Sequence, residues 1–426
     1  MDRHLWIIRG GDRLEGEVRV PGAKNAVLPA LAAALLTPER CVLRQVPDIT
    51  DVRIMVEILE TLGARVEVAG DVHGLALAVE ARDLPHHRVP PDKMERVRSS
   101  SFLLGPLLAR VGRATLFSPG GCDLGPRPID LHVKGLRAMG ARIDTEDGGV
   151  QAQVDRLHGA QIHLDYPSVG ATENLMLAGV LAEGTTVIIN AAREPEIVDL
   201  GILLDRMGAH VRGAGTSTIR IEGVARLAGT EHTVIPDRIV TGTLVLAAVM
   251  TRGDLRLRGV IPDHVRSLLM NLGGEGVHIE AGEDWIRVRA RGRLAPVRLR
   301  TLPYPGFPTD LQAPLVAALT LADGSSRVRE TIFTRRFAHV EPLIRMGASI
   351  EVKGDELFVA GVRALRGTTV EARDLRAGAA LVLAGLAAEG ETVIRGGEQI
   401  DRGYAALDRL LQSLGAKVSV KARESA

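Results

Sequence analysis

The chain has 426 residues, 46% of them apolar, and a formal net charge of +1. Its length allows two domains with cores of ordinary size, and its near-zero net charge disfavours a general nucleic-acid binder. Only 3% of the residues are aromatic, which also disfavours stacking on bases. No signal-peptide core follows Met1, and no apolar run reaches membrane-spanning length. Since two cysteines make no disulfide framework, these features indicate a cytoplasmic protein.

A short phrase, the end of a helix followed by glycine and a strand, returns six times along the chain. In Leu136-Arg-Ala-Met-Gly-Ala-Arg-Ile143, for example, the glycine can stop the helix at its C′ position. Internal repetition on this scale decides the fold, because each copy must form the same small unit. The glycines lie 65–77 residues apart, at Gly63, Gly140, Gly208, Gly273, Gly347 and Gly415.

Each phrase is preceded by an apolar helix, a turn and a β-branched strand, as in residues 174–189, and residues 380–394 match that segment closely. These first helices are apolar on nearly every side, so we expect them to be buried with sheets outside them. The second helices, such as residues 52–62, carry charges on one face and should lie nearer to solvent.

The pattern therefore predicts an α/β fold built from six strand-helix-strand-helix-strand-strand units of about 70 residues. A solenoid is the alternative, but solenoid repeats are usually about 20–45 residues long. Six larger units better suit two domains of three units each.

Charged and polar residues stand where the buried helices should begin. If the units share one orientation, the helix starts face one side, where their dipoles favour anions. N-caps at Asp310 and Asp374 with solvated basic residues are the alternative. Capping does not explain cations at these starts, whereas a bound polyanion does. The starts are Lys24-Asn25, Arg98-Ser99, Ser168–Thr172, Asp237-Arg238, Asp310 and Asp374–Arg376.

The stretch 118–132 holds three glycines and three prolines, which predicts a loop. Pro128 can open a helix over residues 129–139. Cys122 lies five residues before Arg127, and a nearby guanidinium together with open access favours a reactive thiolate. Cys41, in the apolar run Cys-Val-Leu, is instead expected in the core.

Six motifs carry a family resemblance over essentially the whole chain. They are Pro21-Gly-Ala-Lys-Asn-Ala26, the Cys122 loop, Ala192-Arg-Glu-Pro-Glu196, Phe307-Pro-Thr-Asp310, Asp374-Leu-Arg376 and Ile400-Asp-Arg-Gly-Tyr404. With them the chain resembles the UDP-N-acetylglucosamine 1-carboxyvinyltransferases, which are UDP-GlcNAc enolpyruvyl transferases.

The resemblance implies the enolpyruvyl transferase fold, which consists of two inside-out α/β barrel domains with three βαβαββ repeats each. Residues 24–235 would form the domain with the Cys122 loop. Residues 1–23 and 236–426 would form the second domain, and the active site would lie in the cleft between the two.

The resemblance also implies an activity. Family members move the enolpyruvyl group of phosphoenolpyruvate to the 3′-hydroxyl of UDP-N-acetylglucosamine and release phosphate, the first committed step of peptidoglycan synthesis. By resemblance, Asp310 is the base near the hydroxyl. Cys122 is the proton donor to the vinyl carbon, and it can also add covalently to phosphoenolpyruvate. Lys24, Asp374 and Arg402 complete the implied catalytic set.

Phosphoenolpyruvate carries a phosphate and a carboxylate, which planar bidentate donors suit. By resemblance its contacts are Lys24, Asn25, Arg127 and Arg402, with Arg336 and Arg376 as further arginines. For the nucleotide sugar the resemblance gives Arg98, Arg127, Pro128, Ile129, Asp130, Leu131, Ser168, Val169, Gly170, Asp310 and Ile332. The histidines form no ligand-spaced cluster, so we expect no metal and no cofactor. We also expect no nucleic-acid or membrane partner.

The chain departs from the common family pattern at Tyr166-Pro167, where a lysine and a small apolar residue are frequent. Two further departures are Ile239-Val-Thr241, without the acidic residue common after Arg238, and Glu398-Gln399, in place of an aromatic-His pair. The first weakens the expectation of a cationic nucleotide contact there. None of the three removes a principal catalytic group.

Two other functions compete with this interpretation. The first is the sister enolpyruvyl transferase acting on shikimate 3-phosphate, but the Cys122 loop and residues 192–196 favour the nucleotide-sugar enzyme. The second is a non-catalytic regulator that binds nucleotide sugar. The retention of Lys24, Cys122, Asp310 and the other implied catalytic residues argues against it.

Cys122 should add covalently to fosfomycin, an epoxide phosphonate whose targets are family members with this cysteine. An anion site near the thiol would hold the phosphonate and replace collision by positioning. Mass spectrometry should find one adduct, mapped to Cys122 and formed faster with UDP-GlcNAc present. Cys41 is the internal control and should stay unmodified. Labelling at Cys41, or none with UDP-GlcNAc present, would contradict the assignment of Cys122.

Overall fold

The apolar helices expected from the sequence are present, and they are buried. In α8 (Arg238–Met250) and α10 (Gln312–Leu319) every residue is buried, including polar Thr241, Thr243 and Gln312. Such helices cannot face water on any side, so the remaining elements have to surround them. The other helices of this kind are α1 (Lys24–Ala33), α4 (Leu104–Val111), α6 (Val169–Gly179) and α12 (Leu375–Ala387).

The structure, a computed structural model, describes residues 4–71, 73–94, 96, 98–117, 129–145, 149–272 and 276–422. These residues divide into two compact units. The first unit lies within residues 22–117 and 129–235, and the second within residues 4–21 and 236–422. No helix in the described ranges is long and apolar enough to cross a membrane.

In the first unit, α1, α4 and α6 are each followed by a strand, a second helix and a β-hairpin. The first repeat continues with η1 (Ala34–Leu36), β3 (Cys41–Val46), α2 (Thr50–Leu62), β4 (Arg65–Asp71) and β5 (Gly74–Glu80). The second comprises α3 (Pro91–Met94), η2 (Arg98–Leu103), β6 (Arg113–Leu116), α5 (Asp130–Ala138), β7 (Arg142–Asp144) and β8 (Val150–Gln153) around α4. The third has β9 (Gln161–His163), β10 (Thr185–Ile189), α7 (Pro195–Arg206), β11 (His210–Arg212) and β12 (Thr218–Glu222), and β13 (Glu231–Thr233) follows.

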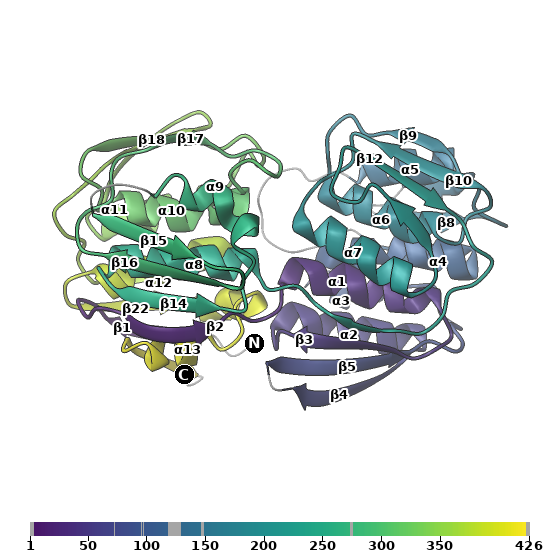
Figure 1. The fold of residues 1–426 in the computed structure, drawn as a ribbon, viewed down its shortest axis with the longest axis horizontal. Helices are drawn as coiled ribbons and strands as arrows, with labels where there is room; N and C mark the ends of the chain where they lie inside the picture. The colour runs from purple at the N-terminus through teal and green to yellow at the C-terminus, as the bar shows by residue number, and fades with distance from the viewer. Residues whose placement is uncertain are drawn as a thin grey trace. The chain divides into compact units, whose positions relative to one another are not determined.

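The second unit repeats this order around α8, α10 and α12, which pack against one another inside it (Figure 1). Its first repeat has β14 (Asp254–Arg258), η4 (Pro262–Val265), α9 (Arg266–Leu269), β15 (Val277–Ala281) and β16 (Trp285–Ala290). The next has β17 (Arg298–Arg300), η5 (Thr309–Leu311), β18 (Ser325–Arg329), α11 (Val340–Arg345), β19 (Ser349–Lys353) and β20 (Glu356–Ala360). The last has β21 (Thr369–Glu371), β22 (Glu391–Arg395), η6 (Gly397–Arg402), α13 (Leu407–Ser413) and β23 (Lys417–Ala422).

The N-terminal strands belong to the second unit. There β1 (His4–Arg9) pairs antiparallel with both β22 and β23, and β2 (Glu15–Arg19) pairs parallel with β14. The sheet orders are β15-β16-β14-β2, β17-β18-β20-β19 and β21-β22-β1-β23. Each sheet therefore joins one parallel edge strand to three antiparallel ones, and strands such as β16 alternate buried and half-buried residues as a sheet over a core requires.

The first unit has two sheets of the same type, β13-β3-β5-β4 and β11-β12-β10-β9. The third sheet, β6-β8-β7, has three strands. Where the repeat predicts a parallel edge strand, the described residues form one isolated bridge between Arg88 and Thr115. Pro85, Pro90 and Pro91 flank this stretch, and proline cannot donate to a strand ladder. The two inside-out α/β barrels expected from the sequence are thus present, with one incomplete edge.

The repeated glycines end the second helices in the left-handed conformation. Their φ angles are 113° at Gly63, 97° at Gly140, 96° at Gly208, 94° at Gly347 and 95° at Gly415. Gly273 lies outside the described residues. A left-handed backbone penalises any residue with a Cβ, so the helix stops where the phrase places glycine.

Gly347→Ala should lower the free energy of unfolding by about 1 kcal/mol. A Cβ at this position meets no atom within 4 Å, so the cost comes from the backbone conformation rather than from a clash. Denaturant unfolding measures the change. Gly70→Ala is the control, because Gly70 also has open space around its Cβ position but no positive φ. Equal stability of the Gly347→Ala variant and the parent protein would contradict this explanation of the repeat.

Candidate active site

Asp310 is the centre of an ionic cluster in the second unit. It lies in η5, directly before buried α10. Its Oδ1 accepts a hydrogen bond of 2.7 Å from Nη2 of Arg336, and its Oδ2 accepts one of 2.7 Å from Nη2 of Arg376. Both arginines are buried. One carboxylate therefore holds two guanidinium groups beside the start of a buried helix.

The charge state of Asp310 follows from this arrangement. Burial alone would raise the pKa of its carboxyl, but the charges of Arg376 and Arg336, with a smaller contribution from Arg238, lower that pKa well below its ordinary value. In turn, burial would lower the pKa of Arg376, yet Asp310 raises it above its ordinary value. Asp310 and Arg376 are therefore both ionised at neutral pH.

Glu330 fixes the loop that follows β18. Its Oε1 accepts hydrogen bonds from Thr301 Oγ1 and from the backbone N of Ile332, both of 2.8 Å. Its Oε2 accepts one of 2.8 Å from Thr309 Oγ1. Because Thr309 Oγ1 also accepts a 2.9 Å hydrogen bond from Arg336 Nη1, the loop and the cluster are connected. The predicted residue Ile332 thus lies in a loop with a rigid polar anchor.

Arg376 has a second partner, Tyr404. Arg376 Nη1 donates to the Tyr404 hydroxyl at 3.3 Å, and that hydroxyl lies 3.0 Å from Thr243 Oγ1 of α8. Asp374 is the N-cap of α12 and accepts from the backbone N atoms of Arg376 and Ala377. The predicted residues Asp374 and Arg376 are thus placed by the start of one helix. Asp374 acts there as the cap that sequence analysis anticipated.

Arg402 and the Glu398-Gln399 pair lie in the same 3₁₀ helix, η6. Arg402 Nη1 donates to Gln399 Oε1 at 3.4 Å, a long hydrogen bond. Gln399, which departs from the family pattern, therefore contacts a predicted catalytic arginine.

The consecutive arginines Arg335 and Arg336 differ in exposure, because Arg335 is exposed and Arg336 is buried.

In the first unit, Lys24 begins α1 and pairs with a buried carboxylate. Its Nζ lies 2.7 Å from Oδ2 of Asp51, and the two side chains are 12% and 3% exposed. Asp51 stands in the first turn of α2, where the helix dipole favours an anion. Asn25 follows in the first turn of α1 and is half-buried.

Ser168, Val169 and Gly170 form the start of α6. Ser168 is the N-cap, and its Oγ accepts from the backbone N of Ala171 at 3.3 Å. A Cβ at Gly170 would come within 3.3 Å of the His132 ring, so glycine permits a close approach there. The ring Nδ1 of His132 lies 2.9 Å from Asn174 Nδ2.

Asn174 ties these elements together. Besides His132, its Nδ2 donates to the carbonyl of Ser101 at 2.7 Å, and its Oδ1 accepts from the backbone N of Gly105 at 2.6 Å. The starts of α4 and α5 are thus connected to the middle of α6 through one buried amide. The predicted residues Ile129, Asp130 and Leu131 stand at the start of α5, directly before His132.

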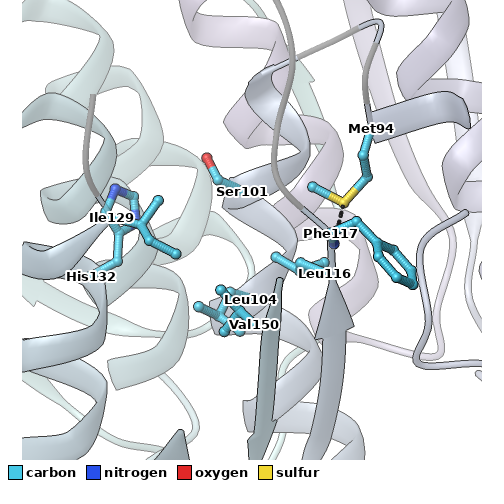
Figure 2. A pocket seen from close by; sticks show the side chains of 8 residues that line it. All are labelled: Met94, Ser101, Leu104, Leu116, Phe117, Ile129, His132 and Val150. Carbon is cyan, nitrogen blue, oxygen red and sulfur yellow. Dashed lines mark hydrogen bonds between the residues drawn. The ribbon is translucent and has the colours of Figure 1, made fainter. Parts of the chain in front are cut away.

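Figure 2 shows the small pocket beside this network. Ile129 and His132 of the α5 start line it, together with Ser101 and apolar side chains, and Met94 Sδ lies 3.2 Å from the backbone N of Phe117. Its volume is about 10 Å³, which is room for about one water molecule. Among the described residues, a space of this volume is too small to hold a substrate.

For some of the predicted site residues the structure gives no side-chain position. Cys122, Arg127 and Pro128 lie outside the described residues, and Arg98 is the first residue of η2. Cys41, expected in the core, is buried on β3, and burial raises the pKa of its thiol.

Two expectations need correction. Asp310 is not an N-cap residue, because η5 precedes α10 and the cap positions are occupied by Pro308 and Leu311. Cations at the helix starts also do not require a bound polyanion, since Lys24 and Arg376 have Asp51 and Asp310 as partners. Sequence reasoning missed Asp51, Glu330 and Asn174. Asn174 had a signal in the sequence, because it directly precedes the apolar run 175–182, whereas Asp51 and Glu330 stand among other polar residues.

Comparisons with known proteins address both the fold and the family of this chain. A family model described as EPSP synthase (3-phosphoshikimate 1-carboxyvinyltransferase) matches residues 8–411. The enolpyruvyl transferase NikO from Streptomyces tendae has a TM-score of 0.88 and 28% identity, with full coverage of both chains. An EPSP synthase from Acinetobacter baumannii has a TM-score of 0.74 at 20% identity, covers 98% of this chain and 100% of its own, and supports the fold alone. The protein is thus an enolpyruvyl transferase in fold.

Two sequence relatives narrow the class. The UDP-N-acetylglucosamine 1-carboxyvinyltransferase 1 of Symbiobacterium thermophilum is 52% identical over 416 residues, covering 97% of this chain and 94% of that protein. The one from Carboxydothermus hydrogenoformans is 49% identical over 413 residues, covering 97% of each. The chain belongs to the family of UDP-N-acetylglucosamine 1-carboxyvinyltransferases.

Beneath the helix starts of the first unit lies a buried carboxyl group, Glu173 of α6. It is 0% exposed, and neither of its oxygens has a hydrogen-bond partner in the described part of the chain. Burial raises the pKa of Glu173 well above its ordinary value, and the nearby carboxylates of Glu196 and Glu194 add to the effect. Glu173 is therefore protonated in the folded protein at pH values where it is ionised in the unfolded chain.

Glu173→Gln should flatten the decline of stability with rising pH. Because the folded protein holds this proton more tightly, the free energy of unfolding falls as pH rises from the ordinary glutamate pKa to the raised one, by up to about 1.4 kcal/mol per pH unit. Denaturant unfolding across this pH range measures the slope. Glu183→Gln, at an exposed position, is the control. Equal slopes for the parent and Glu173→Gln would contradict the prediction.

Proposed function

We propose that this protein transfers the enolpyruvyl group of phosphoenolpyruvate to the 3′-hydroxyl of UDP-N-acetylglucosamine and releases phosphate. The observation that carries the proposal is 52% identity, over nearly the whole chain, to a UDP-N-acetylglucosamine 1-carboxyvinyltransferase. The reaction is the first committed step of peptidoglycan synthesis, and so the protein serves cell wall biogenesis. Its partners are then small molecules, and its place of action is the cytoplasm.

In this proposal, Arg336 and Arg376 stabilise negative charge as it develops on the reacting groups. Guanidinium groups suit that task because they stay charged and form bidentate hydrogen bonds. Both are buried and oriented by Asp310, so little reorganisation is needed when the substrate arrives. Arg402, Asn25, Arg127 and Lys24 are the proposed contacts to phosphoenolpyruvate.

Asp51 positions Lys24 in this scheme. The 2.7 Å contact holds the ammonium group at the start of α1, where the helix dipole would otherwise repel it. An incoming phosphate group can then pair with an ammonium group that Asp51 has already oriented. Asp51 is accordingly a positioning residue for the proposed reaction.

Asp310 is the proposed base for the sugar hydroxyl. Its lowered pKa keeps it ionised, and each of its oxygens has a second lone pair besides the one facing an arginine. The same low pKa makes it a weak base, so orientation of the hydroxyl is a large part of its proposed role. Cys122 is the proposed donor of the proton to the vinyl carbon. Asp374 supports the cluster as the cap of α12.

The nucleotide sugar is proposed to contact the starts of η2, α5 and α6 and the loop after β18. These contacts are Arg98, Arg127, Pro128, Ile129, Asp130, Leu131, Ser168, Val169, Gly170, Asp310 and Ile332. The network around Asn174 supports this assignment, because it links η2, α5 and α6 through hydrogen bonds.

Phosphate release from phosphoenolpyruvate tests the function. Release should depend on UDP-N-acetylglucosamine and should not occur with shikimate 3-phosphate. Release with shikimate 3-phosphate alone would establish the sister activity instead. Binding of UDP-N-acetylglucosamine without any release would establish a non-catalytic regulator.

Asp310→Asn should lower kcat roughly 10²–10⁴-fold, the usual contribution of a general base. The substitution removes the negative charge between two buried guanidinium groups, so we also expect a lower free energy of unfolding. Steady-state kinetics and denaturant unfolding separate the two effects. If kcat is unchanged in the folded variant, Asp310 is not the base.

Asp355→Asn is the matched control for this prediction. It removes an aspartate that pairs with Arg329 at 2.8 Å in the same unit, but at an exposed position. Exposed pairs contribute about 0–1 kcal/mol, so both kcat and stability should stay near the parent values.

A further inference from the structure

An arginine-lined pocket lies at the opposite ends of α8, α10 and α12 from the ionic cluster. Its volume is about 280 Å³, and it is formed where these three helices end in the second unit. Its charged lining consists of Arg13, Arg252, Arg293, Arg363, Asp12 and Glu389. The helices α8 and α12 have 13 residues each, so about 20 Å separates their two ends.

The turns that carry three of these arginines are built alike and held by the backbone. Arg13 precedes Leu14, whose carbonyl accepts from the N of Asp254 at 2.9 Å, just after α8. The carbonyl of Leu294, next to Arg293, accepts from the N of Asp323 at 2.8 Å. Near Arg363, the carbonyl of Leu365 accepts from the N of Glu389 at 2.9 Å. Each arginine-bearing turn is thus fixed against the end of one buried helix.

One of the four arginines has a plain structural role. Arg293 donates from Nε to the carbonyl of Leu321 at 2.9 Å, and from Nη2 to those of Ala322 at 2.7 Å and Val362 at 2.6 Å. These hydrogen bonds satisfy carbonyls at the end of α10, where the helix dipole favours a cation. Helix capping therefore accounts for Arg293.

Capping does not account for the other three. In the described ranges of the chain, the guanidinium groups of Arg13, Arg252 and Arg363 make no hydrogen bond or ion pair, and all three side chains are exposed. Arg252 also has a φ of 53°, a left-handed backbone that costs a residue with a Cβ about 1 kcal/mol or more. Glycine would avoid this cost, so the backbone conformation at this position does not favour arginine.

The charge balance of the pocket is positive. Of the two acidic lining residues, Asp12 pairs with Lys417 at 3.2 Å, which leaves Glu389 against four arginines. Three helix C-termini contribute about half a negative charge each and reduce this excess without reversing it. Because the arginines come from separate fixed turns, they surround the pocket rather than project from one patch.

We propose that this pocket binds a small polyanion that carries at least two phosphate groups. Guanidinium groups are the usual ligands for phosphate oxygens, which they bind bidentately, and three available arginines suit more than one phosphate. Backbone-fixed turns reduce the ordering cost of binding. The pocket lies at the far ends of the three helices from the ionic cluster of the second unit, and it shares no residue with that cluster.

Isothermal titration with inorganic pyrophosphate at low salt tests the proposal. The parent protein should bind pyrophosphate at the pocket, and the variant Arg252→Glu/Arg363→Glu should lose at least tenfold in affinity or one equivalent of bound ligand. The control variant Arg298→Glu/Arg300→Glu makes the same charge change at exposed arginines of β17 and should bind like the parent. A milder variant, Arg252→Gln/Arg363→Gln, provides the same comparison if the charge reversal impairs folding.

Turnover separates this site from the proposed active site. The pocket variants should keep the parent rate of phosphate release from phosphoenolpyruvate, because none of their changed residues belongs to the ionic cluster. Equal pyrophosphate binding by the parent and both pocket variants would overturn the proposal. An equal loss of binding in the β17 control would also overturn it, because net charge alone would then explain the effect.

Discussion

Burial of three helices in each unit is the constraint on which the rest of the structure depends. A helix with no solvent-facing side has to be enclosed, and in the second unit three sheets enclose α8, α10 and α12. Inside an enclosed helix the backbone polar groups bond to one another, so only the N–H and C=O groups at its two ends are available to other partners. Several buried charged groups accordingly stand at helix starts, among them Asp51, Asp374 and Arg376.

At the helix starts, buried carboxylates solve an electrostatic problem. The dipole of a helix start repels a cation, and burial makes an uncompensated charge costly. Asp51 and Asp310 compensate Lys24 and the arginine pair, so the cations proposed to bind anionic substrates can be buried before any substrate is present. The chain thereby keeps a preorganised set of positive groups without losing stability to their mutual repulsion.

The fold could be predicted from the sequence because its signals are local and repeated. The spaced glycines permit the left-handed residue that ends five of the second helices in the described part of the chain, and the apolar segments such as α8 admit only buried positions. The incomplete edge at Arg88 was not predicted, because the repeat pattern does not show where neighbouring prolines remove strand donors.

Pairings within the candidate site were less predictable, because they depend on tertiary packing. Lys24 and Asp51 are 27 residues apart, and Asp310 and Arg376 are 66 apart, so neither pair shares a local pattern. The capping interpretation of Asp310 failed because one turn of 3₁₀ helix, η5, moves the start of α10 past it. Asp374, with no such turn, caps α12 as its position in the sequence indicates.

The N-terminal strands impose an order on how the protein is made. At about 5–20 residues per second, a ribosome takes about 20–80 s to synthesise some 400 residues. Strand β1 is synthesised well before β22 and β23, the strands it pairs with, and β2 is synthesised before its partner β14. The first unit lies within residues 22–235 and can close during synthesis, whereas β1 of the second unit stays unpaired until the last strands have been made. Charged residues in β2, such as Glu15, Glu17 and Arg19, suit a strand that must wait unpaired.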